Sequence, residues 1–326
     1  MLTILVPTYS TRSKLLSRLI NYMAACNFKY KILVADSSEP IHLENNSSLI
    51  KSVESKLDIK HLQFDKNIIN WQKYAIASSQ IKTPYMLFNA DDDFFIPSSI
   101  EKAFQFLALH PEYSIAQGYT VAFELNQNDN YRGIIQAVKF QPTTHFSIEY
   151  SFAYERLMKH LQLYQGTFYG VHRTQQLAEN LTKVANLKLK LGFRFEELLP
   201  SCLSIIQGKL KLLDTLYLFR QSMNQSDQCK REAYRNLPYT FPEWIADPNW
   251  SDYYSTFRLC LAEKLSNQEN INHNNALSVV KNAIFSYLMT HGVHHKFDNR
   301  FSLQSLLQKS SPYHNDFMRI YEATSI

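Results

Sequence analysis

Glycine is scarce in this sequence of 326 residues: the chain has seven glycines, and the first of them is Gly118. Glycine-rich loops bind phosphate because their backbone amides can approach it closely, as in G-x-G-x-x-G and Walker-type turns. The first strand-to-helix turns of this chain cannot be loops of that kind. This excludes the usual dinucleotide-binding and P-loop sites from the N-terminal part of the chain.

Cysteine is also rare, and its spacing carries no metal-binding pattern. The residues Cys26, Cys202, Cys229 and Cys260 form no C-x-x-C pair and no Cys/His cluster of the zinc-finger type. This usage predicts reduced thiols and a cytoplasmic location.

Long apolar runs and basic clusters are missing as well. No uncharged apolar stretch approaches the roughly 18 residues that a membrane helix requires, and the N-terminal residues do not have the pattern of a signal peptide. The formal charge of +5, from 34 basic and 29 acidic residues, is spread along the chain. We therefore expect no nucleic-acid partner, and membrane contact only as peripheral association with the cytoplasmic face.

Hydrophobic residues make up 45% of the chain, enough for one large core or for one core with a smaller satellite. Short apolar runs alternate with helical periodicity in the first part of the sequence. Strands are predicted at 2–6, where Pro7 ends the run, and at 31–36, 59–64 and 84–89; helices are predicted around 15–23 and at 70–79. Such alternation is typical of an α/β fold with a parallel sheet covered on both faces.

The later elements are less regular. We expect helices from a Ser98 or Ser99 cap to 109, and at 148–160, 174–186 and 195–206, with strands at 114–123, 164–171 and 210–219 and a loop at 124–132. Beyond residue 230 the sequence is mainly helical. The predicted organisation is a catalytic-type α/β domain over 1–225 and a helical C-terminal extension over 226–326.

Polar residues follow three of the early strands. These are Pro7-Thr8-Tyr9, Asp36-Ser37-Ser38 and the acidic run Asp91-Asp92-Asp93. Ligands of an open parallel sheet bind outside the carboxyl ends of its strands, so the three groups should converge on one crevice.

The acidic run is the strongest chemical signal in the chain. Three adjacent carboxylates repel one another unless a cation or a proton intervenes. On an extended segment Asp91 and Asp93 point to the same side and could share one ion, while Asp92 faces the other way. Oxygen ligands favour Mg²⁺ or Mn²⁺ over zinc. A solvated acidic turn is the alternative interpretation.

The order and spacing of these residues resemble the signatures of family 2 glycosyltransferases, inverting enzymes of the GT-A fold. The resemblance covers the chain up to the strand at 210–219 and includes Asn67 with Lys73 six residues later. It implies a GT-A-type, Rossmann-like, mostly parallel sheet flanked by helices. It also implies transfer of a hexosyl or N-acetylhexosaminyl group from a nucleotide-sugar donor, most often UDP-linked, to a hydroxyl of a glycan or lipid-linked acceptor, as in polysaccharide biosynthesis.

The resemblance also implies roles for particular residues. Pro7, Tyr9 and Asp36 would hold the base and ribose of the donor, and Lys73 would approach the nucleotide. Asp91 and Asp93 would address the ribose and a Mn²⁺ or Mg²⁺ ion on the diphosphate, with Asp92 as a further donor-binding candidate whose role is open. The alternatives are structural: Tyr9 as a cover of the sheet edge, Asp36 as a helix cap, and Lys73 as a solvated helix residue.

Three later residues, an acid pair and an arginine, complete the candidate site. Glu196-Glu197 resembles the paired-acid motif in which one carboxylate deprotonates the acceptor hydroxyl; Glu197 is preferred and Glu196 is the alternative. Both could instead be acids favoured by a helix N-terminus. Arg220, after the strand at 210–219, could neutralise the leaving diphosphate or be an ordinary surface arginine.

Other interpretations compete with an active transferase. A degenerate GT-A domain that binds a nucleotide or glycan without turnover is the main alternative. A D-x-D-x-[Thr/Val] phosphatase is disfavoured because Phe95 occupies the Thr/Val position, and a sugar-phosphate nucleotidyltransferase because the Gly-rich loop is missing.

His291, His294 and His295 provide only a weak zinc-site pattern. The helices after residue 230 could pack on the catalytic domain, form a homodimer surface or lie on a membrane.

Overall fold

The computed structural model describes residues 1–126, 131–140, 145–187, 197–222, 245, 248–290 and 300–325. Its strands are β1 (Leu2–Ser10), β2 (Lys31–Ser38), β3 (Ile59–Gln63), β4 (Tyr85–Phe88), β5 (Phe94–Phe95), β6 (Tyr113–Leu125), β7 (Ile135–Phe140), β8 (Val171–Arg173) and β9 (Lys209–Gln221). Its helices are α1 (Ser13–Ala25), α2 (Pro40–Val53), α3 (Asn70–Ser79), α4 (Pro97–Leu109), α5 (Ala153–Gln162), α6 (Thr174–Asn186), α7 (Leu198–Gln207), α9 (Ser251–Glu269), α10 (His273–Thr290), α11 (Leu303–Leu307) and α12 (His314–Ser325), with a 3₁₀ turn at Pro248–Trp250.

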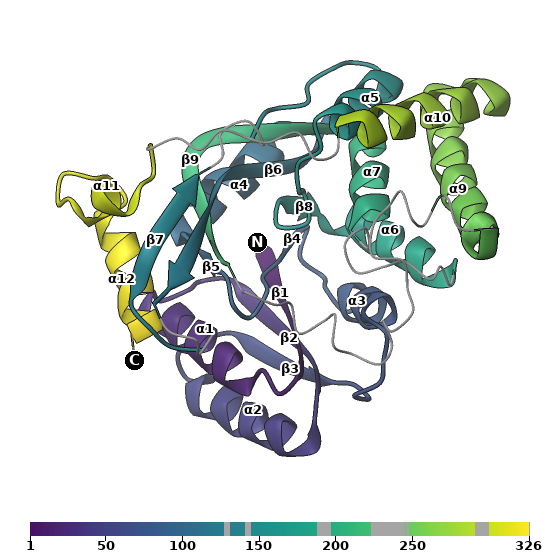
Figure 1. Ribbon diagram of the computed structural model, residues 1–326. Coiled ribbons are helices and arrows are strands. Elements are labelled where there is room, and N and C mark those ends of the chain that lie inside the picture. The colour runs from purple at the N-terminus through teal and green to yellow at the C-terminus, as the bar shows by residue number, and fades with distance from the viewer. Residues whose placement is uncertain are drawn as a thin grey trace.

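One mixed sheet runs through the molecule in the order β3-β2-β1-β4-β8-β6-β9-β5, and β7 pairs with β6 (Figure 1). The four strands of its N-terminal half are parallel to one another. β8 is antiparallel to both β4 and β6, and β6 runs parallel to β9. The parallel half is the part that the alternating sequence pattern predicts.

The two faces of the sheet belong to two hydrophobic clusters, and strand periodicity divides the residues between them. Along β1, Leu2, Ile4 and Val6 point into one cluster, whereas Leu5 points into the other. The first cluster contains side chains of α1, α4 and α12, and the second contains side chains of α3, α5, α6, α7, α9 and α10. This arrangement explains why the early strands are apolar at nearly every position.

The C-terminal helices divide between these two faces (Figure 1). α9 and α10 pack on α5 and α7, whereas α12 packs on α1 and α11 packs on β7. The C-terminal part is helical, as predicted, and it shares its cores with the N-terminal part. The boundary between residues 225 and 226 stays a prediction. In the part of the chain that the structure describes, no helix is long and apolar enough to cross a bilayer.

Most early boundaries are confirmed, but two predicted ends are wrong. β1 does not stop before Pro7 and continues to Ser10. β4 pairs with β1 only as far as Leu5, and the N–H that Pro7 lacks would point toward the side where β4 has ended, so no ladder bond is lost. α4 begins at Pro97, without a cap from either predicted serine, because Pro97 is favoured at the first helical position.

The predicted strand at 164–171 is also wrong: only Val171–Arg173 is a strand. The Gly170 amide donates to the Thr167 carbonyl at 2.9 Å, which closes a turn in place of a ladder. The predicted helix at 148–160 begins later, at Ala153, because Ile148 forms a bridge to Leu210 in β9. The short β5 and β7 were not predicted, and the residues 124–125 assigned to a loop belong to β6.

Candidate functional site

The carboxyl ends of β1, β2 and β4 bring the predicted donor-site groups together. Thr8 on β1 lies opposite Asp36 on β2 in the parallel register. The Lys73 ammonium, from α3, donates to the Thr8 carbonyl at 2.8 Å and to the Ser37 hydroxyl at 2.9 Å. The Thr8 hydroxyl donates to the Asp91 carboxylate at 2.7 Å. One hydrogen-bonded network therefore joins all three sequence motifs and Lys73.

Asp36 is completely buried and hydrogen-bonded within the protein. Its carboxylate accepts bonds from the Ser38 amide at 2.9 Å and from the Asn46 side-chain amide at 2.8 Å, and it contacts the His61 Nε2 at 2.9 Å. Burial alone would raise the pKa of Asp36, but these bonds, His61 first, outweigh it and lower the pKa below its ordinary value. The carboxylate is thus held ionised and fixes the end of β2.

Lys73 and Tyr9 lie beside each other at the end of β1. The Lys73 side chain is fully buried, so the alternative of a solvated helix residue is wrong. Its ammonium lies 5.7 Å from the centre of the Tyr9 ring, and the Arg12 guanidinium lies 5.3 Å from the same ring. Tyr9 and Pro7 are both partly exposed at this edge. Two cations are thus packed around an aromatic ring that solvent can reach.

The first acid of the run is neutralised by a protein cation that the sequence interpretation missed. The Arg12 Nε donates to Asp91 Oδ1 at 2.9 Å and its second terminal nitrogen lies 2.5 Å from the same oxygen. That nitrogen also lies 2.8 Å from the Asp92 carboxylate. Burial raises the pKa of Asp91, and Arg12 opposes this rise. Both Asp91 oxygens are therefore engaged inside the protein, with Thr8 and Arg12.

The last acid has a different environment. Asp93 is only 3% exposed, its Oδ1 accepts the Gln221 amide at 3.0 Å, and its Oδ2 lies 3.5 Å from the Arg220 Nε. Burial and the neighbouring Asp92 raise the pKa of Asp93 to about 7, although Arg220 lowers it. Asp93 is thus a buried carboxylate whose negative charge is only partly compensated.

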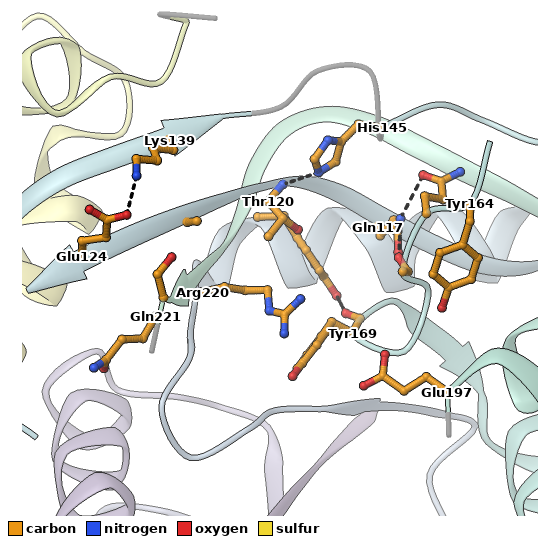
Figure 2. Close-up of a pocket in the computed structure, with 15 residues that line it drawn as sticks. Gln117, Thr120, Glu124, Lys139, His145, Tyr164, Tyr169, Glu197, Arg220 and Gln221 are labelled. Carbon is orange, nitrogen blue, oxygen red and sulfur yellow. Dashed lines mark hydrogen bonds and ion pairs between the residues drawn. The ribbon is translucent and has the colours of Figure 1, made fainter. Parts of the chain in front are cut away.

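A cavity of about 580 Å³ opens beside Asp93 and contains both late candidates (Figure 2). Glu197, Arg220, Tyr164 and Tyr169 project into it from different segments. The Arg220 guanidinium lies 4.8 Å from the centre of the Tyr169 ring. Asp93 itself contacts Arg220 and Gln221, which line the cavity. A base candidate, a cation and the acidic run therefore meet at one site.

Glu197 is the residue immediately before α7, and its carbonyl accepts the Ser201 amide at 3.1 Å. Within the described residues its carboxylate does not cap the helix. Burial raises the pKa of Glu197, with Arg220 opposing the rise. A raised pKa brings a carboxylate nearer to the value that suits a general base at neutral pH.

The far end of the cavity is polar. Lys139 on β7 pairs with Glu124 on β6. His145 accepts the Thr120 amide through its Nε2 at 3.0 Å. These groups line the part of the cavity away from Glu197 (Figure 2), where they could contact a hydroxylated ligand.

Some predicted residues lie outside the described part of the chain: Glu196 and the three histidines 291, 294 and 295. Among the described residues, no group of three or more His, Cys, Asp and Glu side chains is arranged to hold a metal ion by itself. Of the predicted site residues, Glu197 and Arg220 line the cavity, and Asp36, Lys73 and Asp91 form the buried network beneath the strand ends.

Sequence reasoning missed Arg12, Tyr164 and Tyr169. Arg12 carries a readable signal, since an arginine follows a strand end at which three acids are expected to converge. Tyr164 and Tyr169 carry none, because the strand that their segment predicts gives neither ring a functional position. In the folded chain both rings line the cavity.

No protein-family model and no curated protein matches the sequence. Among solved structures, the fold is similar to that of residues 1–349 of S. aureus TarS: identity 16%, TM-score 0.56, covering 99% of this chain and 80% of that one. For the same fragment in complex with UDP-GlcNAc, the identity is 18% and the TM-score is 0.57, covering 99% of this chain and 81% of that one. For its complex with UDP, the identity is 15% and the TM-score is 0.51, covering 91% of this chain and 93% of that one. At these identities the similarity concerns the fold, and it confirms the predicted α/β class with a helical C-terminal part.

Proposed function

We propose that this protein is a nucleotide-sugar-dependent glycosyltransferase of the inverting type, with a UDP-linked sugar as donor. The observation that carries the proposal is the cavity lined by both Glu197 and Arg220. Asp93 lies next to this cavity, with its Oδ2 3.5 Å from the Arg220 Nε. A fold shared with a protein that has been crystallised with UDP-GlcNAc and with UDP supports the same conclusion. The acceptor would be a hydroxyl of a glycan or a lipid-linked molecule.

Glu197 and Arg220 would divide the chemistry of the transfer. Glu197 removes the proton from the acceptor hydroxyl, whose oxygen forms the new bond to the anomeric carbon. The bond from that carbon to the diphosphate breaks, and the electron pair leaves with the diphosphate. Arg220 stabilises the negative charge on that leaving group. The buried setting of Glu197 supports this role because its raised pKa favours proton uptake.

The residues present fit a divalent cation held mainly by the donor. Mg²⁺ and Mn²⁺ sites of this kind use one or two carboxylates, with phosphate oxygens and water as the other ligands. Asp93 would supply the carboxylate, because its charge is incompletely compensated, whereas Asp91 is bonded to Arg12. When bound, the ion would neutralise charge on the diphosphate. Asp91 and Arg12 would keep the acidic run in position for this contact.

The test is release of UDP from UDP-GlcNAc and from a panel of other donors by the full chain, with Mn²⁺, with Mg²⁺ and with EDTA. We expect metal-dependent release. Glu197→Gln should lower the turnover number by about 10²–10⁴-fold, as expected for loss of a general base, and leave donor affinity within about threefold. Asp93→Asn should weaken metal-dependent donor binding itself.

The matched control is Asp58→Asn, an exposed acid just before β3, at the opposite edge of the sheet. It should change neither donor binding nor turnover. Retention of turnover in Glu197→Gln would refute its role as the base. Metal-dependent nucleotide binding without release from any donor, with or without glycan acceptors, would refute the transferase and favour a nucleotide- or glycan-binding domain.

A further inference from the structure

A second cavity, of about 570 Å³, lies between α1, α2, α12 and the start of the segment that leads into β7. Figure 1 shows α1 beside both α2 and α12, on the side of the sheet away from α3 and α7. The cavity shares none of its described lining residues with the Glu197 cavity. Its size is within the range of small-molecule sites, roughly 300–1,000 Å³.

The lining of this second cavity is strongly cationic. Lys14, Arg18, Arg132 and Arg319 contribute four positive charges, and Glu322 contributes the single carboxylate among the described lining residues. Three of the cations are exposed on the rim, whereas Arg18 is 7% exposed. Such an excess of positive charge favours an anionic group.

Two buried polar side chains in the lining have atoms without a partner. In the described part of the chain, neither the Arg18 Nε nor the Asn46 Oδ1 makes a hydrogen bond, although Asn46 is fully buried. Buried polar atoms are usually satisfied, so an unmet donor and acceptor in one cavity lining call for an explanation. Both atoms are closed to solvent, so a bound polar group would satisfy them only together with a shift of these two side chains.

Part of the remaining wall is apolar, beside polar residues such as Ser17 and Asn21. Tyr22, Ala25, Leu49 and Ala323 line it, and Leu49 and Ala323 also pack on the core of this face. Inorganic phosphate alone would leave this wall uncovered, and an uncharged amphiphile would not neutralise the excess positive charge of the lining. The lining matches a molecule that has both an anionic head and an apolar body.

Arg18 and Asn46 also reach toward the donor side. Arg18 donates to the Asp92 carbonyl at 3.3 Å and to the Gln221 side-chain oxygen at 2.5 Å. Asn46 donates to the Asp36 carboxylate at 2.8 Å. The two residues with unmet atoms are therefore those that connect this cavity to the acidic run and to the end of β2.

We propose that the α1–α2–α12 cavity binds an anionic amphiphile, an organic phosphate with an apolar chain, and that its occupancy is coupled to nucleotide binding through Arg18 and Asn46. The binding itself does not depend on the proposed transferase activity; the coupling does depend on a nucleotide site at the strand ends.

The binding test is calorimetric titration of the full chain with octyl phosphate below its micelle concentration. We expect saturable binding to one site. The double variant Lys14→Gln/Arg319→Gln should bind at least about tenfold more weakly, because two charge-assisted contacts are lost. The matched control Lys51→Gln/Lys102→Gln removes two exposed lysines, on α2 and α4, that do not line the cavity, and should bind as the parent does. Thermal melts verify that both variants are folded.

Several results would overturn the proposal: no binding of octyl phosphate, equal loss in both double variants, or equally tight binding of inorganic phosphate or of octyl glucoside. Competitive displacement of octyl phosphate by UDP would also overturn it, because the two would then share one site.

The coupling is tested by measuring UDP affinity with and without saturating octyl phosphate. We expect a change of at least about threefold in the parent chain and no change in Lys14→Gln/Arg319→Gln. An unchanged affinity in the parent would refute the coupling. A protein that binds octyl phosphate but no nucleotide would refute the proposed function and the coupling, and would leave the amphiphile site in place. Flotation with phosphatidylglycerol vesicles separates the two sources of this chemistry: flotation that requires Lys14 and Arg319 assigns a membrane lipid, and its absence assigns a soluble amphiphile.

Discussion

Asp91 and Asp93 belong to one acidic run and are both buried, yet their surroundings are opposite. Asp91 faces Arg12 and Thr8, which bind both of its oxygens. Asp93 faces the cavity side, where the Arg220 Nε lies 3.5 Å from its carboxylate and the Arg220 side chain is 52% exposed. The charge of Asp91 is compensated by the protein, and that of Asp93 is only partly compensated. Proximity in sequence therefore does not give two acids the same role.

The largest expected effect comes from removing Arg12, the cation that compensates the charge of Asp91. Arg12→Gln leaves Asp91 buried without its cation, and we expect a loss of about 3–5 kcal/mol in the free energy of unfolding, measured by denaturant titration. The double variant Arg12→Gln/Asp91→Asn should recover most of this loss because the uncompensated charge is gone.

The control for this experiment is Arg300→Gln, which breaks an exposed pair with Asp214 whose side chains are 48% and 77% accessible. It should cost less than about 1 kcal/mol. A loss of that small size in Arg12→Gln would show that Asp91 does not need its cation.

The second prediction concerns Asp93, whose charge is only partly compensated. The folded-state pKa of Asp93, about 7, lies above the ordinary value of 3.8, so its contribution to stability is present at low pH and is lost as the pH rises through 7. Asp93→Asn removes this loss. In EDTA the variant should match the parent near pH 4 and exceed its free energy of unfolding by about 2 kcal/mol or more at pH 8.

Denaturant titrations across this pH range measure the difference, with Asp58→Asn as the control. A gain that does not grow between pH 4 and pH 8 would contradict the raised pKa. The same Asp93→Asn substitution is expected to weaken donor binding, so the stability gain and the functional loss arise from one charge.

The smallest effect is expected for Arg220, which interacts with two acids, Asp93 and Glu197. Arg220 lowers the pKa of both acids. Arg220→Gln should therefore raise the pKa of Asp93 by about one unit, or roughly 1.4 kcal/mol. The measurement is the pH midpoint of the stability difference between Arg220→Gln and Arg220→Gln/Asp93→Asn, and a midpoint at or below the parent value would exclude a direct interaction.

Much of the N-terminal fold was predictable from local pattern. The helix at Asn70–Ser79 has the predicted bounds, and β2, β3 and β4 agree within two residues, because apolar runs and helical periodicity are properties of neighbouring residues. The strand end at Pro7 was not predictable, since it depends on where β4 stops. The serine cap of α4 failed because Ser99 hydrogen-bonds to Leu216 on β9, which is far away in sequence.

The sequence alone determined which residues could carry the chemistry: the acidic run, Asp36, Lys73 and the acid at 197, together with the absence of an early glycine-rich loop. Only the tertiary structure decided how these residues are arranged and which partners they have. It buried Asp91 against Arg12, turned Tyr169 toward Arg220, and brought Glu197 and Arg220 into one cavity. The physical reason is that the charge state of a carboxylate depends on its burial and on its partners, and these partners come from strands and turns that meet only when the chain is folded.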